Sequence, residues 1–359
     1  MEPANSALPG FKTKFNKHAK IYDLRFYMEL FKLTRQLVDI ESISMNEKNV
    51  AVFLGDYLRK LGAEVELEEA EPDRPNVMAR WGKPDVVLST HIDTVPPFFP
   101  SREDDEFIHG RGSCDAKGIV AAQVEAAVRL AAEGVRDVGL LFLVGEERNN
   151  AGAYCANKRT PGSRYLINGE PTENLLAVGT KGVLRLEFEA AGRMAHSAYP
   201  ELGESATEKL IEACYRLRDM KLPEDKLLGK TTYNIGIIAG GVAPNVIPGS
   251  ARAEVMYRTV SPPDELQQAV EQKVAGLVDV KRVLQIPAVH LGRMEGLETT
   301  VVAFCTDIPS LTNWGEPYLL GPGSILVAHT EHEHVSKKEL VQAVEIYVKM
   351  VKRMKSSDG

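Results

Sequence analysis

The stretch VVLSTHID, residues 86–93, decides the fold because it joins an apolar run directly to a histidine and an aspartate. The run Val86 to Leu88 predicts a buried strand. Strands of this kind are typical of parallel α/β sheets, in which ligands bind outside the carboxyl ends of the strands. We therefore expect His91 and Asp93 at such a sheet edge. Because they are two positions apart, they share one face, and Asp93 can accept the ring N–H that His91 does not use for a metal.

Three further apolar runs also end in residues that bind metals. They are 140–144 before Glu146 and Glu147, 165–167 before Glu170, and 325–328 before His329. Singly, each residue is as well explained by a solvated acid or a histidine with a satisfied hydrogen bond. Together at strand ends they indicate a metal centre. Histidine and carboxylate ligands without thiolates suit zinc, with cobalt or manganese as substitutes.

A fifth candidate ligand is Asp115, within GRGSCDAKG at 110–118, just before a helix predicted over 116–132. A phosphate-binding loop is the alternative for this glycine-rich segment. Such a loop needs glycine directly before its lysine, and Ala116 occupies that position, so the nucleotide interpretation is rejected.

The adjacent pair Glu146 and Glu147 suggests a division of roles, because neighbouring side chains cannot point the same way. One of them can bind a metal while the other acts as a general base. The alternative is an acidic surface turn, which the preceding apolar strand makes less favourable.

Size and composition set the broader class. The chain has 359 residues, enough for two domains, and is 44% hydrophobic and 26% charged, without an apolar run long enough to span a membrane. A net charge of −7 without a basic run disfavours nucleic acid as a partner. Its 4 cysteines form no CxxC pair, so we expect neither a disulfide framework nor a thiolate site, and a reducing cytoplasm fits best. Residues 1–22 lack the apolar core of a secretory signal and are expected to form an N-terminal arm.

Several stretches, in this order along the chain, carry a family resemblance: STHIDTVP, GRGSCDAKG, LVGEE, GEPT, GRMAHSAYPELG, GGVAPNVIPG, GPG and AHTEHEHV. From about residue 23 to the C-terminus, the chain resembles the co-catalytic zinc family of aminoacylases, acetylornithine deacetylase, succinyl-diaminopimelate desuccinylase and glutamate carboxypeptidases. The resemblance implies a zinc-exopeptidase-like α/β domain with a central mixed sheet flanked by helices.

The resemblance also implies roles for the candidate residues. His91 and Glu170 resemble the ligands of one of two divalent metal ions, Glu147 and His329 those of the other, and Asp115 the bridge between them. Glu146 resembles the general base and Asp93 the acid that orients His91. A cis peptide bond is expected between Asp115 and Ala116. His332 and His334 are extra relative to the family, whereas Glu333 matches a family acid.

Between Glu170 and His329, the pattern strand, helix, two strands, helix, strand predicts a small inserted α+β (ferredoxin-like) domain. We expect the catalytic domain at 23–178 and 290–359 and this lid at 179–289. The family uses such a lid to form a homodimer, in which the histidine matching His196 reaches the partner's site and stabilises the oxyanion. Asn245, Arg258 and the backbone of Gly321 and Gly323 match positions that hold the substrate carboxylate.

These features predict hydrolysis of an N-acyl amino acid, with Glu146 taking the proton of a water between two metals. Among family members, the short chain most resembles acetylornithine deacetylase and its relatives acting on acetylcitrulline or carrier-bound lysine. A carboxypeptidase or dipeptidase is an alternative, because peptides also present an amide next to a free carboxylate. A non-catalytic acyl-amino-acid binding protein is a third. Departures from the family pattern occur at EERNNAGA (146–153), at 204–206 and at 294–304.

Overall fold

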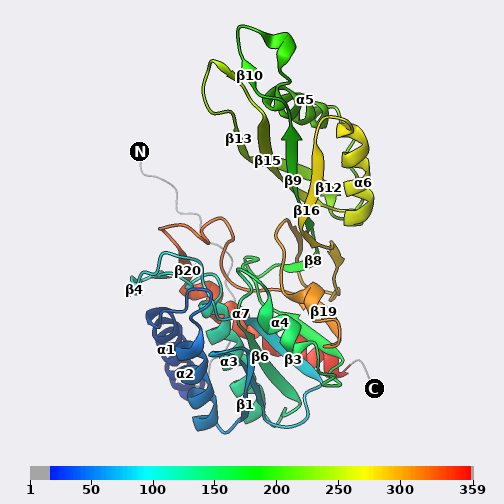
Figure 1. Cartoon of the computed structure of the whole chain (residues 1–359). Helices are drawn as coiled ribbons and strands as arrows, with labels where there is room; N and C mark the ends of the chain where they lie inside the picture. Colours follow the sequence, from blue (N-terminus) through cyan, green and yellow to red (C-terminus); the bar gives the residue numbers. More distant parts are fainter. Residues whose placement is uncertain (1–16, 357–359) are drawn as a thin grey trace, which may run out of the picture.

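The computed structural model describes residues 17–356, with side chains described from residue 27 onward (Figure 1). A larger lower part contains a central sheet between helices, and a smaller upper part contains a second sheet with two helices. Among the described helices, none is long and apolar enough to cross a membrane.

The central sheet of the described chain is mixed and runs in the order β1-β2-β6-β3-β7-β19-β8-β17, with β18 also paired to β8. Its strands are β1 (Glu64–Glu71), β2 (Arg74–Arg80), β3 (Val86–His91), β6 (Val138–Leu143), β7 (Tyr165–Asn168), β8 (Leu176–Thr180), β17 (Val289–His290), β18 (Thr299–Val302) and β19 (Glu316–Leu319). In the middle of this sheet, β6, β3, β7 and β19 are parallel, whereas β1, β2 and β8 are joined antiparallel. The carboxyl ends of the parallel strands therefore meet at one edge.

Helices cover both faces of this sheet. They are α1 (Lys17–Asp39), α2 (Lys48–Lys60), α3 (Lys117–Ala132), α4 (Ala151–Ala156) and α7 (Lys337–Ser356). Side chains of β3 alternate between two cores: Val86 and Leu88 pack with α1, α2, α3 and α7, and Val87 packs with α4 and Trp314. This alternation explains why the strand begins with three successive apolar residues and is buried at every position.

The upper part is a four-stranded antiparallel sheet in the order β13-β15-β9-β16, packed on two helices. Its elements are β9 (Gly182–Ala191), α5 (Ala206–Arg218), β13 (Thr232–Gly240), β15 (Ser250–Thr259), α6 (Pro263–Val274) and β16 (Asp279–Ile286). The order strand, helix, two strands, helix, strand is the predicted one. Leu184, Leu186 and Phe188 of β9 face α5 and α6 and form a core of its own.

Short elements complete the described chain. They are β4 (Arg102–Glu103), β5 (Phe107–His109), β10 (Ala195–His196), η1 (Pro200–Leu202), β11 (Glu224–Asp225), β12 (Gly229–Lys230), β14 (Val246–Ile247), η2 (Ile308–Ser310) and β20 (His334–Ser336). In this set, β20, β5 and β4 form a three-stranded sheet, and β10 pairs with β14 in the lid.

Two expectations need correction. The N-terminal arm was expected to reach residue 22, but α1 begins at Lys17, and residues 1–16 lie outside the described part. The run 325–328 is a turn, so the prediction of a strand there is wrong. Its first two side chains are exposed, Ile325 at 37% and Leu326 at 82%, and only Ala328 is buried. The place beside β7 in the sheet is taken instead by β19, and the chain then crosses to His329 as a loop.

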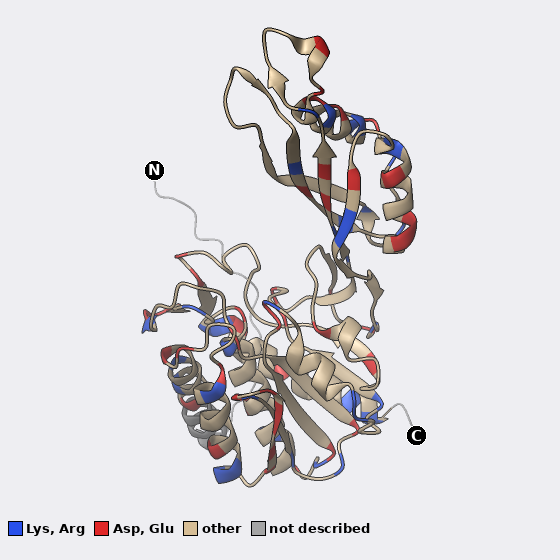
Figure 2. Cartoon of the chain, viewed as in Figure 1, with Lys and Arg blue, Asp and Glu red and all other residues tan. Residues whose placement is uncertain are grey.

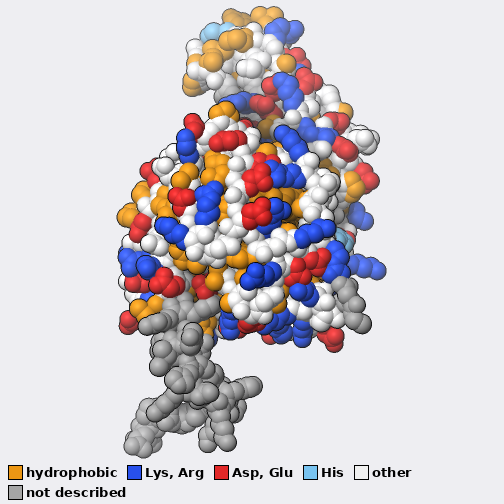
Figure 3. Space-filling view, turned by 90° about the horizontal axis from the view of Figure 1, so that it is seen from below, with side chains coloured by type: hydrophobic (Ala, Val, Ile, Leu, Met, Phe, Trp, Pro, Cys, Tyr) orange, Lys and Arg blue, Asp and Glu red, His pale blue; other side chains and the backbone are white. Residues whose placement is uncertain are grey.

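Charged residues of both signs are interspersed along α1, α5 and α6 in Figure 2. The view from below in Figure 3 shows the same mixture over the larger part of the molecule. A typical pair is Arg216 with Glu212 on α5, at 2.9 Å and half-exposed. Such surface pairs contribute about 0–1 kcal/mol each, so the fold depends mainly on the buried cores.

Candidate active site

Three parallel strands deliver their predicted residues to one sheet edge. His91 is the last residue of β3, the acid pair Glu146 and Glu147 follows β6, and Glu170 follows β7. His91 and Glu170 are buried. Gly145 makes the turn after β6 with φ of +79°, where a side chain would meet Asn149 and Arg74. The expectation that strand ends bring these residues together is confirmed for these three strands.

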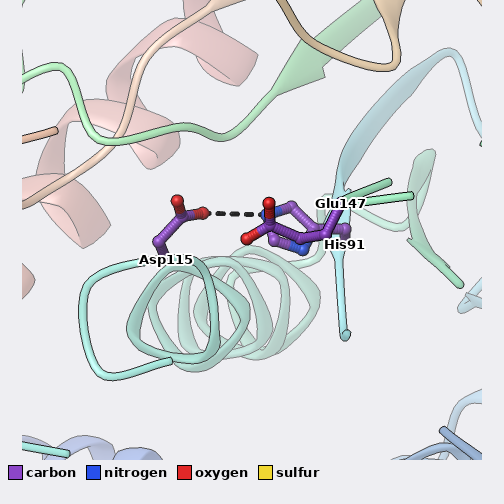
Figure 4. A group of neighbouring side chains, drawn as sticks. All are labelled: His91, Asp115 and Glu147. Atoms are coloured by element: carbon purple, nitrogen blue, oxygen red, sulfur yellow. Dashed lines mark hydrogen bonds and ion pairs between the residues drawn. The ribbon is translucent and has the colours of Figure 1, made fainter. Parts of the chain in front are cut away.

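Asp115 lies directly before α3, and its two carboxylate oxygens face two different histidines. Oδ1 is 2.9 Å from Nε2 of His91, and Oδ2 is 3.3 Å from Nε2 of His329. Figure 4 shows Asp115, His91 and Glu147 pointing toward one another. The expected cis peptide bond between Asp115 and Ala116 is present. Each oxygen of this carboxylate therefore points to a different half of the predicted centre, as a bridging ligand requires.

His329 completes the cluster from the C-terminal part of the chain. Its Nε2 lies 2.8 Å from Oε1 of Glu147, and its side chain is 48% exposed. The residue has a left-handed backbone with φ of +63°, which turns the ring back toward the cluster. Ligand atoms of His91, Asp115 and Glu147 all lie within 4.8 Å of one another, so this group can hold a metal ion.

Asp93 connects His91 to the acid pair. Nδ1 of His91 is 3.0 Å from the backbone carbonyl of Asp93 and 3.4 Å from its Oδ1. A carbonyl can only accept, so Nδ1 carries a proton and Nε2 is left for a metal. The carboxylate of Asp93 accepts the backbone N–H of Glu146 at 3.1 Å, that of Glu147 at 3.2 Å, and the hydroxyl of Ser44 at 2.6 Å. Asp93 thus positions the acid pair as well as the histidine.

Glu333 holds the loop that carries Asp115. Its Oε1 accepts the backbone N–H groups of Gly112, Cys114 and Asp115 at 2.9, 3.2 and 3.1 Å. Its other oxygen pairs with the buried guanidinium of Arg111. The segment 328–335 therefore contributes one cluster residue, His329, and one residue that supports the loop of another.

The neighbouring histidines take other positions. The side chain of His332 is 83% exposed, and His334 lies in β20, where its ring packs on Phe107 with centroids 4.8 Å apart. Neither belongs to the group of described residues that can hold a metal. That neither histidine is a metal ligand stays a prediction.

Negative charge is concentrated in the cluster. Burial raises the pKa of Glu146 and of Glu170 well above the usual value, and it also raises the pKa of Glu147. Burial lowers the pKa of His91, but hydrogen bonds to Asp115 and Asp93 outweigh it and raise the pKa well above normal. Several carboxylates forced together in a buried site are stabilised by cations. The donor set of buried carboxylates and histidines therefore fits divalent metal ions.

A pocket of about 380 Å³ is lined in part by residues 171–173, which directly follow Glu170 in the sequence. Arg258, at the end of β15, lines it as well. Its apolar lining comes from Leu175, residues 301–304 at and after the end of β18, and Ile325. The pocket also contains the carboxylate of Glu173, and Arg258 is the basic residue in it that can bind the carboxylate of an apolar group.

Gly321 and Gly323 do not have free N–H groups for a substrate. The N–H of Gly321 donates to Thr172 at 3.0 Å and that of Gly323 to Glu339 at 2.8 Å. A side chain at Gly323, where φ is +88°, would meet Cys114. These glycines permit close packing behind the site, and their role in holding the substrate carboxylate stays a prediction.

His196 and Asn245 lie together, but away from the cluster. His196 is in β10, paired with Val246 of β14, and the backbone carbonyl of Asn245 accepts the N–H of Ser197 at 3.0 Å. Figure 1 places β10 at the far end of the lid from the central sheet. Both residues are exposed. Within one chain of this conformation, neither contributes to the cluster.

Sequence reasoning did not identify Ser44, Asn150 or Asp307 as parts of the site. Asp307 is buried, and burial raises its pKa to about 6. Its charge is one of those that raise the pKa of Glu146, and its Oδ1 accepts a hydrogen bond from Asn150 at 3.0 Å. No spacing rule links these residues to the strand ends. The departure from the family pattern at EERNNAGA, which contains Asn150, was the one sequence feature that pointed to any of them.

Comparison with known proteins identifies the family. The model for peptidase family M20/M25/M40 matches residues 87–353. The chain belongs to this family. A peptidase M20 domain-containing protein of Schizosaccharomyces pombe is 42% identical over 335 residues, covering 90% of this chain and 84% of that protein. A probable carboxypeptidase of Aspergillus clavatus is 38% identical over 381 residues, covering 93% and 84%.

Solved structures show the same M20 fold. The crystal structure of a tripeptidase from Staphylococcus aureus superposes with a TM-score of 0.77 at 22% identity, covering 91% of this chain and 99% of that one. Together with the M20 relatives, this match confirms the predicted α/β fold class and the prediction of an enzyme that hydrolyses amide bonds. The relatives named here are M20 proteins and carboxypeptidases, so the predicted closeness to acetylornithine deacetylase is not confirmed.

Proposed function

We propose that this M20 protein is a metal-dependent carboxypeptidase that cleaves the amide bond next to a free C-terminal carboxylate. The observation that carries the proposal is the position of Arg258 in the pocket that Pro171 and Thr172, the residues directly after Glu170, also line. A guanidinium binds a carboxylate through two parallel hydrogen bonds, which fixes the end of a peptide. The A. clavatus relative is named a probable carboxypeptidase, which supports the same assignment.

Two divalent metal ions, zinc in the first place with cobalt or manganese as substitutes, complete the proposed centre. His91 and Glu170 would hold one, Glu147 and His329 the other, and Asp115 both. When bound, the ions supply Lewis acidity to the scissile carbonyl and lower the pKa of water. The carboxylates of Asp115, Glu147 and Glu170 would balance most of their charge.

The chain's own residues would perform the remaining steps. Arg258 binds the carboxylate, and the apolar wall of its pocket accepts the side chain of the C-terminal residue. Glu146 takes the proton of the attacking water and passes it to the leaving amine, so the same carboxylate serves as base and then as acid. Its buried environment raises its pKa, which makes it a better proton acceptor.

A second candidate is the hydrolysis of N-acyl amino acids, including the acetylornithine type. The observation that favours it is the modest pocket of about 380 Å³, because an acyl amino acid presents the same amide and carboxylate as a peptide but needs less room. Asn245, on the lid, would contact the substrate in either case only if the lid or a partner subunit brings it to the cluster.

We also propose a homodimer formed through the lid. Strand β13 is an edge strand of the described lid sheet, and it exposes Ile237 and Ile238, while α5 exposes Ile211 and Tyr215. Unpaired edges with apolar side chains favour pairing with another chain. In such a dimer, His196 of one subunit would lie over the centre of the other and stabilise the oxyanion. Light scattering on the wild type and on Ile238→Asp tests this, since only the wild type should be dimeric.

A substrate panel tests the carboxypeptidase proposal. Metal-free protein is reloaded with zinc and incubated with peptides ending in Leu, Lys or Asp, with the same peptides amidated at the C-terminus, and with acetylornithine and acetylcitrulline. We expect release of the C-terminal residue from the free peptide ending in Leu and none from its amide. Turnover of acyl amino acids alone would transfer the assignment to the second candidate, and turnover of the amidated peptide would refute both.

A further inference from the structure

Asp307 is a buried carboxylate that the mechanism above does not use. It is 1% exposed and stands at the N-cap of η2, yet its side chain makes no capping hydrogen bond there. Oδ1 accepts from the side-chain amide of Asn150 at 3.0 Å, and Oδ2 has no hydrogen-bond partner among the described residues. Buried carboxylates normally have both oxygens satisfied. Local stability therefore does not explain why an aspartate occupies this position.

Asn150 ends the loop that carries the acid pair. It has a left-handed backbone with φ of +50°, and its N–H donates to the carbonyl of Gly145 at 2.6 Å. It stands at the N-cap of α4 but makes no side-chain cap there, because its amide is directed to Asp307. At the other side, the N–H groups of Glu146 and Glu147 donate to Asp93. The loop is therefore held by one aspartate at each side.

We infer that Asp307 is a positioning residue for Glu146, acting through its hydrogen bond to Asn150. The inference rests on the proposed function, in which Glu146 is the general base. A base must stay within hydrogen-bond reach of the proton it removes, so a small displacement of its loop lowers turnover while substrate binding at Arg258 remains. The departure of this chain from the family pattern at Asn149-Asn150 supplies the amide that reaches Asp307.

The test is a double-mutant cycle on the zinc-loaded protein, with kcat and KM measured on the best peptide of the panel. Asn150→Gly removes the amide but keeps the left-handed backbone, because glycine adopts positive φ without strain. We expect Asp307→Ala and Asn150→Gly each to lower kcat at least tenfold, with KM changed less than threefold and zinc content unchanged. The kcat of the double variant should be no lower than that of either single variant, because each substitution removes the same hydrogen bond. Asp307→Asn, which keeps an acceptor for Asn150, should restore at least a third of the wild-type kcat.

Asn157→Ala is the matched control. Asn157 ends α4 and links the same two segments through Thr312 at 3.0 Å and Asn313 at 2.8 Å. We expect a lower melting temperature with kcat unchanged. An equal fall in kcat for Asn157→Ala, additive losses in the cycle, or unchanged kcat in both single variants overturns the inference while the function stands. Absence of wild-type turnover on the whole panel overturns the proposed function and the inference with it.

Discussion

The carboxylate of Glu333 accepts the backbone N–H of Asp115 at 3.1 Å, so an acid near the C-terminus holds the loop of the proposed bridging residue. The two residues are 218 positions apart. The same carboxylate neutralises Arg111, whose side chain is also buried. One side chain thus fixes the position of Asp115 and balances a buried charge.

Glu333→Ala should destabilise the protein strongly. It leaves the Arg111 guanidinium buried without its partner, which typically costs about 3–5 kcal/mol, and removes the acceptor of three N–H groups. Glu333→Gln keeps an acceptor oxygen for the N–H groups, so its free energy of unfolding should fall less than that of Glu333→Ala. Urea unfolding of the metal-free variants measures both effects. A decrease of under about 1 kcal/mol in the free energy of unfolding of Glu333→Ala would show that the contacts of Glu333 contribute little to stability.

His329 should be the single metal ligand among the three histidines of 328–335. We expect His329→Ala to bind about one metal ion fewer per chain, because its Nε2 is the atom that faces Glu147 and Asp115. His332→Ala and His334→Ala serve as matched controls and should keep the full metal content. Elemental analysis after dialysis against zinc measures all three. Equal metal loss in a control would contradict the one-ligand assignment.

Much of this centre follows from local sequence. Because β3, β6 and β7 are parallel, their carboxyl ends meet at one edge, and His91, Glu147 and Glu170 come together from the strand pattern alone. The strand predicted before His329 was wrong because apolar residues adjacent in sequence need not be buried, and Leu326 is exposed. Burial depends on the sheet position, which β19 already occupies.

Contacts between distant loops could not be predicted from the same pattern. Ser44 reaches Asp93 across 49 residues, and Asn150 reaches Asp307 across 157. Neither pair has a periodicity or a spacing that links its members. Such pairs appear only once the packing of the sheet, α4 and the C-terminal loops is fixed, since each contact is set by the whole fold.

Glu146→Gln should abolish most activity without loss of metal. A general base contributes about 10²- to 10⁴-fold, so kcat should fall by that range, while zinc content and melting temperature stay close to wild type. The glutamine has the same shape, and the backbone N–H of residue 146 can still donate to Asp93. Retention of more than about a tenth of kcat would assign the base to another residue.

Zinc affinity should rise with pH. Hydrogen bonds to Asp115 and Glu147 raise the pKa of His329 to about 10 in the metal-free protein, so a proton occupies Nε2 at neutral pH and zinc must displace it. Each displaced proton gives about a tenfold gain in affinity for each pH unit below the pKa of its group, and His91, whose pKa is also raised, adds to the slope. Competition with a chelator of known affinity at pH 6.5, 7.5 and 8.5, values spaced about one unit apart, measures the slope. A flat profile would contradict a protonated His329.

Arg258 should determine the requirement for a free carboxylate. A hydrogen bond to a charged group is worth about 1.5–3 kcal/mol, so Arg258→Ala should raise KM by roughly 10- to 150-fold for peptides with a free C-terminus. Arg258→Lys keeps the charge but not the planar fork of the guanidinium. Its KM should therefore lie between those of the wild type and Arg258→Ala. Steady-state kinetics on the peptide ending in Leu measures each variant.

Arg185→Ala is the matched control for Arg258. Arg185 lies on the neighbouring strand β9, opposite Met256, and its guanidinium pairs with Glu254 at 2.9 Å. Because Arg185 does not line the pocket that contains Arg258, its loss should leave KM within about twofold of wild type. If both variants raise KM equally, the effect comes from the charge of the lid sheet as a whole, and the carboxylate is not bound by Arg258 itself.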